Sequence, residues 1–98
     1  MAKVFTHGRW LVTPGREADF VEAWTDLARR AGELRGSERP TLLRDRERQN
    51  LFLTFGGWSD IEAVESFRAS DLFQGAVTRL QPMLESFEPA TLDEVDWT

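Results

Sequence analysis

The sequence predicts an α+β fold in which a four-stranded antiparallel sheet carries helices on one face, the ferredoxin-like arrangement. Segments with strand and helix patterns alternate over the 98 residues in the order β-α-β-β-α-β. Right-handed crossovers in each half of this order give that topology. The third strand segment, residues 50–58, is apolar on both faces, so the sheet needs cover on both sides. No linker or internal repeat interrupts the pattern, and residues 1–98 are expected to form a single domain.

The first half of the chain is predicted to form one strand and one long helix. Residues 3–12 have a strand pattern, and the next three residues, Thr-Pro-Gly, close it. Pro14 suits the entry to a helix because its fixed φ is already helical. The helix follows from apolar residues at helical spacing, which are Phe20, Trp24, Leu27, Ala28, Ala31 and Leu34. Gly32 and Gly36 are the two candidate ends of this helix.

The second half begins with a hairpin. Residues 41–47 and 50–58 form two predicted strands, and the intervening Arg48-Gln49 turn makes them antiparallel. Ser59 is the predicted start of the next helix, because Glu62 follows it at the spacing of a capping box.

This helix is expected to break before the chain returns to the sheet. Its apolar stripe consists of Ile61, Val64 and Phe67. Ser70 and Asp71 then interrupt the pattern and can cap a further helix that runs to Leu84. Pro82 predicts a kink or break in that helix. Residues 87–97 form the last predicted strand.

Composition excludes several classes of function. Cysteine is absent, so neither disulfides nor thiolate chemistry are expected, and a cytoplasmic location is compatible with this. A single histidine makes a transition-metal site improbable. The net charge of −5 and the lack of a basic patch argue against nucleic acid as a partner. No signal peptide or membrane-spanning run is readable, so no membrane partner is expected.

The third strand segment also predicts a cavity and an interface. Its alternate residues Phe52, Thr54, Gly56 and Trp58 share one face. This face combines aromatic walls, a hydroxyl group and an empty volume, as a small organic ligand requires. The other face carries Leu51, Leu53 and Phe55, which the chain's few helices cannot also cover. A homodimer is therefore expected.

Three sequence blocks resemble the antibiotic biosynthesis monooxygenase family, whose members are dimeric α+β barrels. The first block is Pro-Gly-Arg-Glu-Ala-Asp-Phe at residues 14–20, and the second is Trp-Ser-Asp-Ile-Glu-Ala at residues 58–63. The third is Phe-Arg-Ala-Ser-Asp-Leu-Phe at residues 67–73. The blocks follow the family order and spacing. The resemblance implies the fold more specifically than the reaction, since one fold supports many activities.

Within this superfamily, the resemblance implies different residues for different reactions. Cofactor-independent oxygenases of aromatic polyketide biosynthesis place an asparagine and a tryptophan four residues apart on the third strand. The matching positions are Thr54 and Trp58, and the tyrosines that those enzymes use are absent from the chain. The haem-degrading branch uses an asparagine, a tryptophan and a histidine, and Gly8, Phe67 and Val77 stand at those positions. Haem degradation is therefore not expected.

The candidate site residues follow from the strand pattern and the family resemblance taken together. Thr54 and Trp58 are the candidate catalytic residues, although Trp58 is equally compatible with a core anchor, or with both roles. Trp10 shares a strand face with Gly8, which leaves space where a side chain would stand. The candidate substrate-binding residues are Gly8, Trp10, Trp24, Phe52, Phe67, Phe73 and Val77. Trp24 also fits an ordinary core position on the apolar stripe of its helix.

Two other residues have competing interpretations. His7 is the only side chain of the type that ordinarily titrates near neutral pH. Its strand face is opposite the predicted cavity, which favours an interface or surface histidine, and a one-residue register slip would reverse this. Arg44 can receive an anion or carbonyl, or can form a surface pair with Asp45.

By resemblance, the leading function is a small cofactor-independent monooxygenase that acts on an aromatic or polyketide-like molecule. No cofactor and no metal are expected. One alternative is a binding module that captures an apolar metabolite without turnover, which would explain the missing asparagine and tyrosines. Another is an isomerase or cyclase of the same fold, which would need a proton carrier such as His7 in the cavity.

Overall fold

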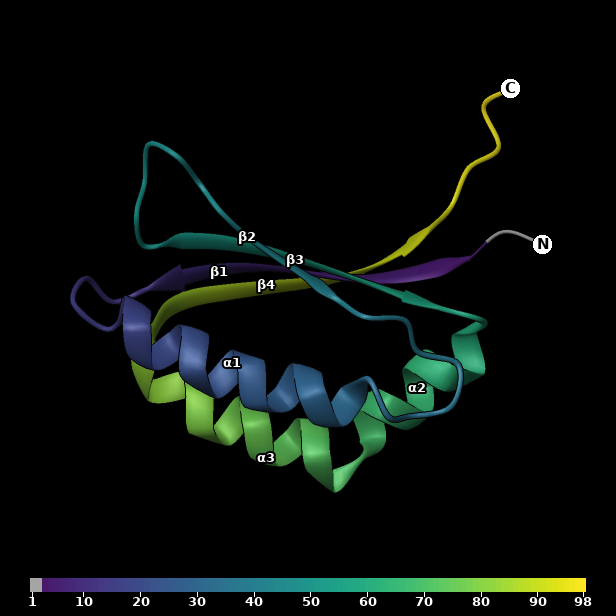
Figure 1. Ribbon diagram of the computed structural model, residues 1–98, viewed down its shortest axis with the longest axis horizontal. Coiled ribbons are helices and arrows are strands. Elements are labelled where there is room, and N and C mark those ends of the chain that lie inside the picture. Colours follow the sequence, from purple (N-terminus) through teal and green to yellow (C-terminus); the bar gives the residue numbers. More distant parts are fainter. Residues whose placement is uncertain (1–2) are drawn as a thin grey trace.

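The computed structural model describes residues 3–98 and has two layers, a sheet and a set of helices on one of its faces (Figure 1). The elements are β1 (Val4–Val12), α1 (Glu17–Ala31), β2 (Thr41–Arg44), β3 (Leu51–Trp58), α2 (Ile61–Ala69), α3 (Asp71–Leu80), the 3₁₀ turn η1 (Gln81–Met83) and β4 (Leu84–Asp93). The strand order is β2-β3-β1-β4, and every neighbouring pair is antiparallel. The predicted ferredoxin-like fold is confirmed.

The start of α2 differs from the prediction by one residue. Asp60, and not Ser59, is the N-cap, and its carboxylate accepts a hydrogen bond from the Ala63 amide at 2.8 Å. Both residue types are good caps, but a carboxylate also interacts favourably with the positive end of the helix. The Ser59 hydroxyl donates to that same carboxylate. The predicted break after α2 is confirmed, because Ser70 caps α3 by accepting from the Phe73 amide.

The hairpin between β2 and β3 is longer than predicted. β2 ends at Arg44 because the Asp45 carboxylate folds back on the chain and accepts from the amides of Glu47 and Arg48 at 2.8 and 2.9 Å. These hydrogen bonds, led by the one from Arg48, hold the pKa of the Asp45 carboxyl below its ordinary value. An aspartate turn of this kind competes with strand pairing.

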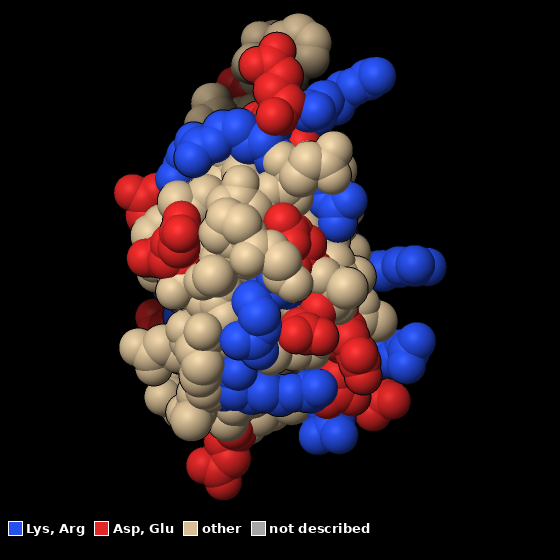
Figure 2. Space-filling view, turned by 90° about the vertical axis from the view of Figure 1, so that its left-hand side faces the viewer, with Lys and Arg blue, Asp and Glu red and all other residues tan. Residues whose placement is uncertain are grey.

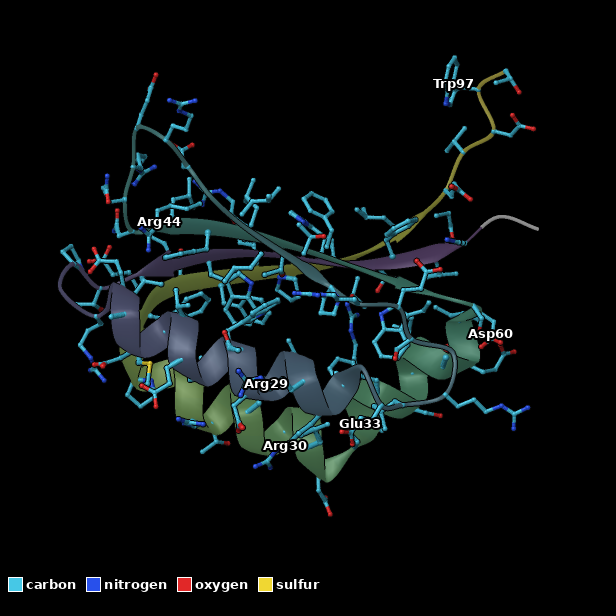
Figure 3. All side chains as sticks on the ribbon, in the orientation of Figure 1. Arg29, Arg30, Glu33, Arg44, Asp60 and Trp97 are labelled. Carbon is cyan, nitrogen blue, oxygen red and sulfur yellow. The ribbon has the colours of Figure 1, made fainter. Side chains whose placement is uncertain are left out.

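The last strand lies earlier in the chain than expected. α3 ends at Leu80, and Pro82 stands in η1, which confirms the predicted break. The chain is then free to enter β4 at Leu84, and β4 ends at Asp93, so the predicted bounds of 87–97 were wrong at both ends. Trp97, which is 88% exposed, ends a tail that leaves the sheet on the side opposite the helices (Figure 3).

Two clusters of buried side chains hold the helices on the sheet. The first core cluster comprises Trp10, Val12, Phe20, Ala23, Trp24, Phe52 and Leu80. The second core cluster comprises Val4, Leu27, Ala31, Trp58, Val64 and Phe67. Both use α1, whose Phe20 ring packs 4.9 Å from the Phe52 ring of β3. Between the two clusters, the helices span a part of the sheet that carries smaller side chains.

Charged side chains of both signs are interspersed on the face shown in Figure 2. Among residues 3–98, no helix is long and apolar enough to cross a membrane. The same residues contain no group of three or more His, Cys, Asp or Glu side chains that could hold a metal ion.

Candidate functional site

A cavity of about 80 Å³ lies between the sheet and the helices, where the two core clusters meet. Its walls include six aromatic residues from the helices and the helix-facing side of the sheet, and several small residues of the central strands. The lining residues are Thr6, His7, Gly8, Trp10, Trp24, Leu27, Ala28, Ala31, Ser37, Glu38, Pro40, Thr54, Phe55, Gly56, Trp58, Phe67, Arg68, Phe73, Phe87 and Pro89. Pockets for drug-sized ligands usually measure about 300–1,000 Å³, so the space in this cavity corresponds to about one aromatic ring of a ligand.

The register of β1 against β3 explains why the cavity exists. Thr6 lies opposite Gly56, and Gly8 lies opposite Thr54, so four small residues form one strip on the helix-facing side. Large pairs flank this strip, with Trp10 opposite Phe52 at one end and Val4 opposite Trp58 at the other. The helices rest on the large residues and leave a hollow above the small ones.

At one end of the strip, Trp10 is held against Thr54. The Trp10 Nε1 donates to the Thr54 hydroxyl at 3.0 Å, and the indole stacks on Phe87 with a centroid distance of 3.9 Å. A β-carbon on Gly8 would lie only 2.5 Å from that Nε1. The space left by Gly8 is therefore occupied by the Trp10 indole, which needs it to reach Thr54.

At the other end, Trp58 makes an equivalent contact with a threonine. Its Nε1 donates to the Thr6 hydroxyl at 3.1 Å, and its ring packs 5.0 Å from the Phe67 ring. Phe73 packs in turn on Phe67 in an edge-to-face geometry. Trp58 is only 4% exposed and also lines the cavity, so a core position and a cavity wall coincide in one residue.

The hydroxyl groups of Thr6 and Thr54 differ in whether their hydrogen already has an acceptor. A threonine hydroxyl has one hydrogen to donate, whereas an indole N–H can only donate. Thr6 accepts from Trp58 and donates to the Gly56 carbonyl at 3.4 Å, so its hydrogen is engaged. Thr54 accepts from Trp10, and its own hydrogen has no acceptor among residues 3–98. Thr54 is thus the cavity hydroxyl that can donate to a bound molecule.

Most of the predicted site residues meet at this cavity. The structure brings together Gly8, Trp10, Trp24, Thr54, Trp58, Phe67 and Phe73. Phe52 and Val77 are not among the lining residues. Phe52 is 1% exposed and packs in the first core cluster, with the Arg44 guanidinium 4.9 Å above its ring. This stacking occupies Arg44, which sequence analysis had considered as an anion site or a surface pair.

The His7 side chain lies on the other side of the sheet. Its ring packs on Phe55 with centroids 4.7 Å apart, and its Nδ1 is 3.0 Å from the Thr54 carbonyl oxygen. Strand alternation puts both rings on the face away from Gly8 and Thr54, so His7 and Phe55 border the cavity through their main chain and not their rings. His7 therefore stands on the face that sequence analysis favoured.

Sequence reasoning missed several residues of the cavity. Thr6 could have been found, because strand alternation puts it on the same face as Gly8 and Trp10. Phe87 belongs to the cavity through its register with β1, which no local pattern reveals. Arg68, a cation in the last turn of α2, was not considered from the sequence and lines the cavity as well. Glu38 also lines it, and its carboxylate is bound to Lys3 at 2.6 Å. That contact raises the pKa of Lys3.

Comparison with known proteins identifies relatives of this architecture. Residues 4–79 match the sequence profile named antibiotic biosynthesis monooxygenase. A variant of SnoaB, a cofactor-independent oxygenase from Streptomyces nogalater, is 25% identical and has a TM-score of 0.88, over 98% of this chain and 95% of that one. A protein from Shewanella oneidensis is 20% identical with a TM-score of 0.86, over 95% and 91% of the two chains. No curated protein sequence matches.

Proposed function

Because the chain belongs to the antibiotic biosynthesis monooxygenase family, we propose that it is a small cofactor-independent monooxygenase acting on an aromatic or polyketide-like molecule. The observation that carries the proposal is the cavity, which combines two indole walls with one hydroxyl whose hydrogen is free. The similarity to SnoaB, itself a cofactor-independent oxygenase, supports it.

In the proposed reaction the substrate itself supplies the electrons that reduce dioxygen, so no redox cofactor is needed. An activated CH₂ group next to an ionised aromatic system is oxidised by dioxygen to a carbonyl. One oxygen atom enters the product, and the other leaves as water together with the two hydrogens of the CH₂ group. The protein would orient the ring, stabilise the anion and exclude bulk water.

The roles of the side chains follow from their contacts. Trp10 and Trp58 would hold the two sides of the ring, since each indole is fixed by a threonine. The Thr54 hydroxyl would donate to an oxygen of the substrate. In the buried cavity such a hydrogen bond is worth more than in water, because the local dielectric is low.

We also propose that the protein works as a homodimer through the sheet face without helices. Leu53 and Phe55 lie half-buried on that face, and Leu43 and Leu92 are 47% and 39% exposed. Burying apolar surface contributes about 25 cal/mol per Å². Figure 3 shows that the tail ending in Trp97 extends on this same side, where a second copy would meet it.

Oxygen uptake tests the catalytic proposal directly. The purified protein is incubated with a panel of quinols and anthrones while dissolved oxygen is recorded. We expect enzyme-dependent uptake with at least one compound, and a new carbonyl group whose oxygen comes from isotopically labelled dioxygen. Dehydrogenation of a quinol to its quinone would not count, because no oxygen atom enters that product. Thr54→Val, which keeps the shape and removes the hydroxyl, should lower kcat by roughly 10-fold or more if Thr54 contacts the reacting oxygen. Uptake equal to the rate without protein for every compound would contradict the proposal.

The second candidate function is a binding module that captures an aromatic metabolite without turnover. It is favoured by Thr54, which stands where the related oxygenases have an asparagine, and by the absence of tyrosine from the chain. This function predicts one ligand bound per cavity, quenched tryptophan fluorescence and no oxygen uptake. The isomerase or cyclase alternative has less support, because the side chain of His7 stands on the opposite sheet face.

A further inference from the structure

Arg68 is the one cation among the described residues that line the cavity. It stands in the last turn of α2 and is partly buried. Its Nη2 donates to the Ala90 carbonyl of β4 at 3.1 Å, and no carboxylate of residues 3–98 pairs with it. Five other cations, Lys3, Arg9, Arg16, Arg30 and Arg79, do have carboxylate partners.

A structural role alone accounts for part of this arrangement. β4 is an edge strand, so the hydrogen bond to Ala90 satisfies a carbonyl of the sheet, and the C-terminal end of α2 offers a partial negative charge. However, a guanidinium has five N–H donors, and within residues 3–98 the Arg68 side chain makes one hydrogen bond, to the Ala90 carbonyl. The remaining donors of Arg68 are therefore available to a ligand.

The other charged group in the cavity wall does not supply that anion. Glu38 is exposed, and its carboxylate is bound to the Lys3 ammonium. The Thr54 hydroxyl offers a second donor to the same cavity and no carboxylate faces it. The free hydrogens of Arg68 and Thr54 in the cavity thus lack an acceptor, and a negatively charged oxygen would bind a guanidinium more strongly than a neutral one.

We propose that Arg68 makes the cavity selective for aromatic ligands that carry an ionised oxygen, of which the phenolate is the best fit. The inference rests on the proposed function and names the substrate class for the same cavity. It also means that no side chain has to act as a general base, because a cation that stabilises the phenolate allows the phenol to lose its proton to water. Arg68 would then bind the oxygen and leave the ring to Trp10 and Trp58.

Single-ring probes suit the volume of the cavity and separate charge from shape. 4-Nitrophenol absorbs at longer wavelength once ionised, so its spectrum reports both binding and the bound form. 4-Nitroanisole is its neutral methyl ether, and 4-nitrobenzoate carries the charge on a carboxylate. We expect the protein to bind the phenolate at least 10-fold more tightly than the ether. Tight binding of the benzoate instead would assign the site to carboxylates and overturn the phenolate assignment.

Variants test whether Arg68 is responsible. Arg68→Gln should weaken phenolate binding roughly 10- to 100-fold and leave the ether within about 2-fold. Arg68→Lys keeps the charge, and should recover part of the affinity. Arg29→Gln removes an exposed arginine of α1 and should leave both ligands as in the parent protein. Melting temperatures of all variants show whether loss of the Ala90 contact unfolds the chain.

The outcomes separate this inference from the proposed function. An unchanged ratio of phenolate to ether affinity in Arg68→Gln, or equal binding of both probes by the parent, overturns the role of Arg68 even if oxygen uptake is found. An Arg68-dependent preference for the phenolate without oxygen uptake by any quinol or anthrone supports the inference and contradicts the oxygenase. Failure of the parent to bind any of the three probes at millimolar concentration overturns the inference as well.

Discussion

On the helix-facing side of the sheet, Phe52 and Trp58 are 1% and 4% exposed, whereas Leu43 and Leu92 on the opposite side are 47% and 39% exposed. Both sides belong to the same strands, and both carry large apolar residues. The first side meets α1 and α3 within one chain, and Figure 1 shows no helix over the second. The difference teaches that one face of this sheet stabilises the subunit and contains the cavity, while the other is suited to a partner.

The largest expected effect comes from placing a charge on the uncovered face. Leu53→Asp puts a carboxylate at the centre of the proposed dimer interface, where desolvating it costs several kcal/mol. Sedimentation at micromolar concentration should give about twice the 11.3 kDa chain mass for the parent and the mass of one chain, or an unfolded chain, for the variant. Ser66→Asp, on the exposed surface of α2, is the control and should stay dimeric. A monomeric parent would falsify the dimer proposal.

A matched pair of phenylalanines distinguishes the two faces directly. Phe52→Ala empties a site in the first core cluster and should cost about 3–5 kcal/mol of unfolding free energy. Its melting temperature should fall equally at all protein concentrations. Phe55→Ala acts on the other face, and its effect should shrink as the protein is diluted below the dissociation constant of the parent dimer, because neither protein is then associated. Scanning calorimetry over a 100-fold range of concentration makes the measurement; identical concentration dependence for both variants would contradict the distinction.

The space above Gly8 can be tested with two glycine-to-alanine substitutions. Gly8→Ala places a β-carbon 2.5 Å from the Trp10 Nε1 and 2.9 Å from the Thr54 hydroxyl, so the indole must move. Overpacking should cost roughly 1–3 kcal/mol and weaken ligand binding. Gly75→Ala on α3 meets nothing within 4 Å, and should instead stabilise the helix by up to about 1 kcal/mol. Urea denaturation measures both changes, and a Gly8→Ala variant as stable as the parent would remove the steric argument.

The sequence predicts the fold far better than the chemistry of the cavity. Alternation and helical spacing are local, so the order of elements, the break at Ser70 and the break at Pro82 could all be read from the chain. The end of β4 could not, because Val95 and Trp97 continue the apolar alternation although no strand residue follows Asp93.

The hydrogen bonds of the site depend on the register between β1 and β3, which are neighbours in the sheet but far apart in the sequence. Trp10 and Thr54 are 44 residues apart, and Thr6 and Trp58 are 52 apart. No local pattern shows that each indole meets a threonine, nor that only Thr54 retains a free hydrogen. The position of Arg68 against β4 depends in the same way on how α2 packs, so the cation of the cavity was visible only as a helix-end residue.

The smallest effect separates the two roles of Trp58 on the helix-facing side. Trp58→Phe keeps an aromatic ring in the second core cluster but removes the donor to the Thr6 hydroxyl. Loss of one such hydrogen bond costs about 1 kcal/mol, so the melting temperature should fall by only roughly 4–8 °C. Ligand affinity and fluorescence quenching should fall more strongly, since the indole forms a wall of the cavity. Trp97→Phe is the matched control, because that indole is 88% exposed and is not among the residues that line the cavity.

The result also bears on whether the cavity is catalytic. If Trp58→Phe binds every probe as tightly as the parent, its indole serves stability alone, and the site must rest on Trp10 and Thr54. If the variant binds normally but consumes oxygen more slowly, Trp58 acts on the reaction and not on capture, as the oxygenase requires and the binding module does not. Parallel loss of binding and uptake, with kcat unchanged at saturating substrate, would instead limit Trp58 to holding the ring.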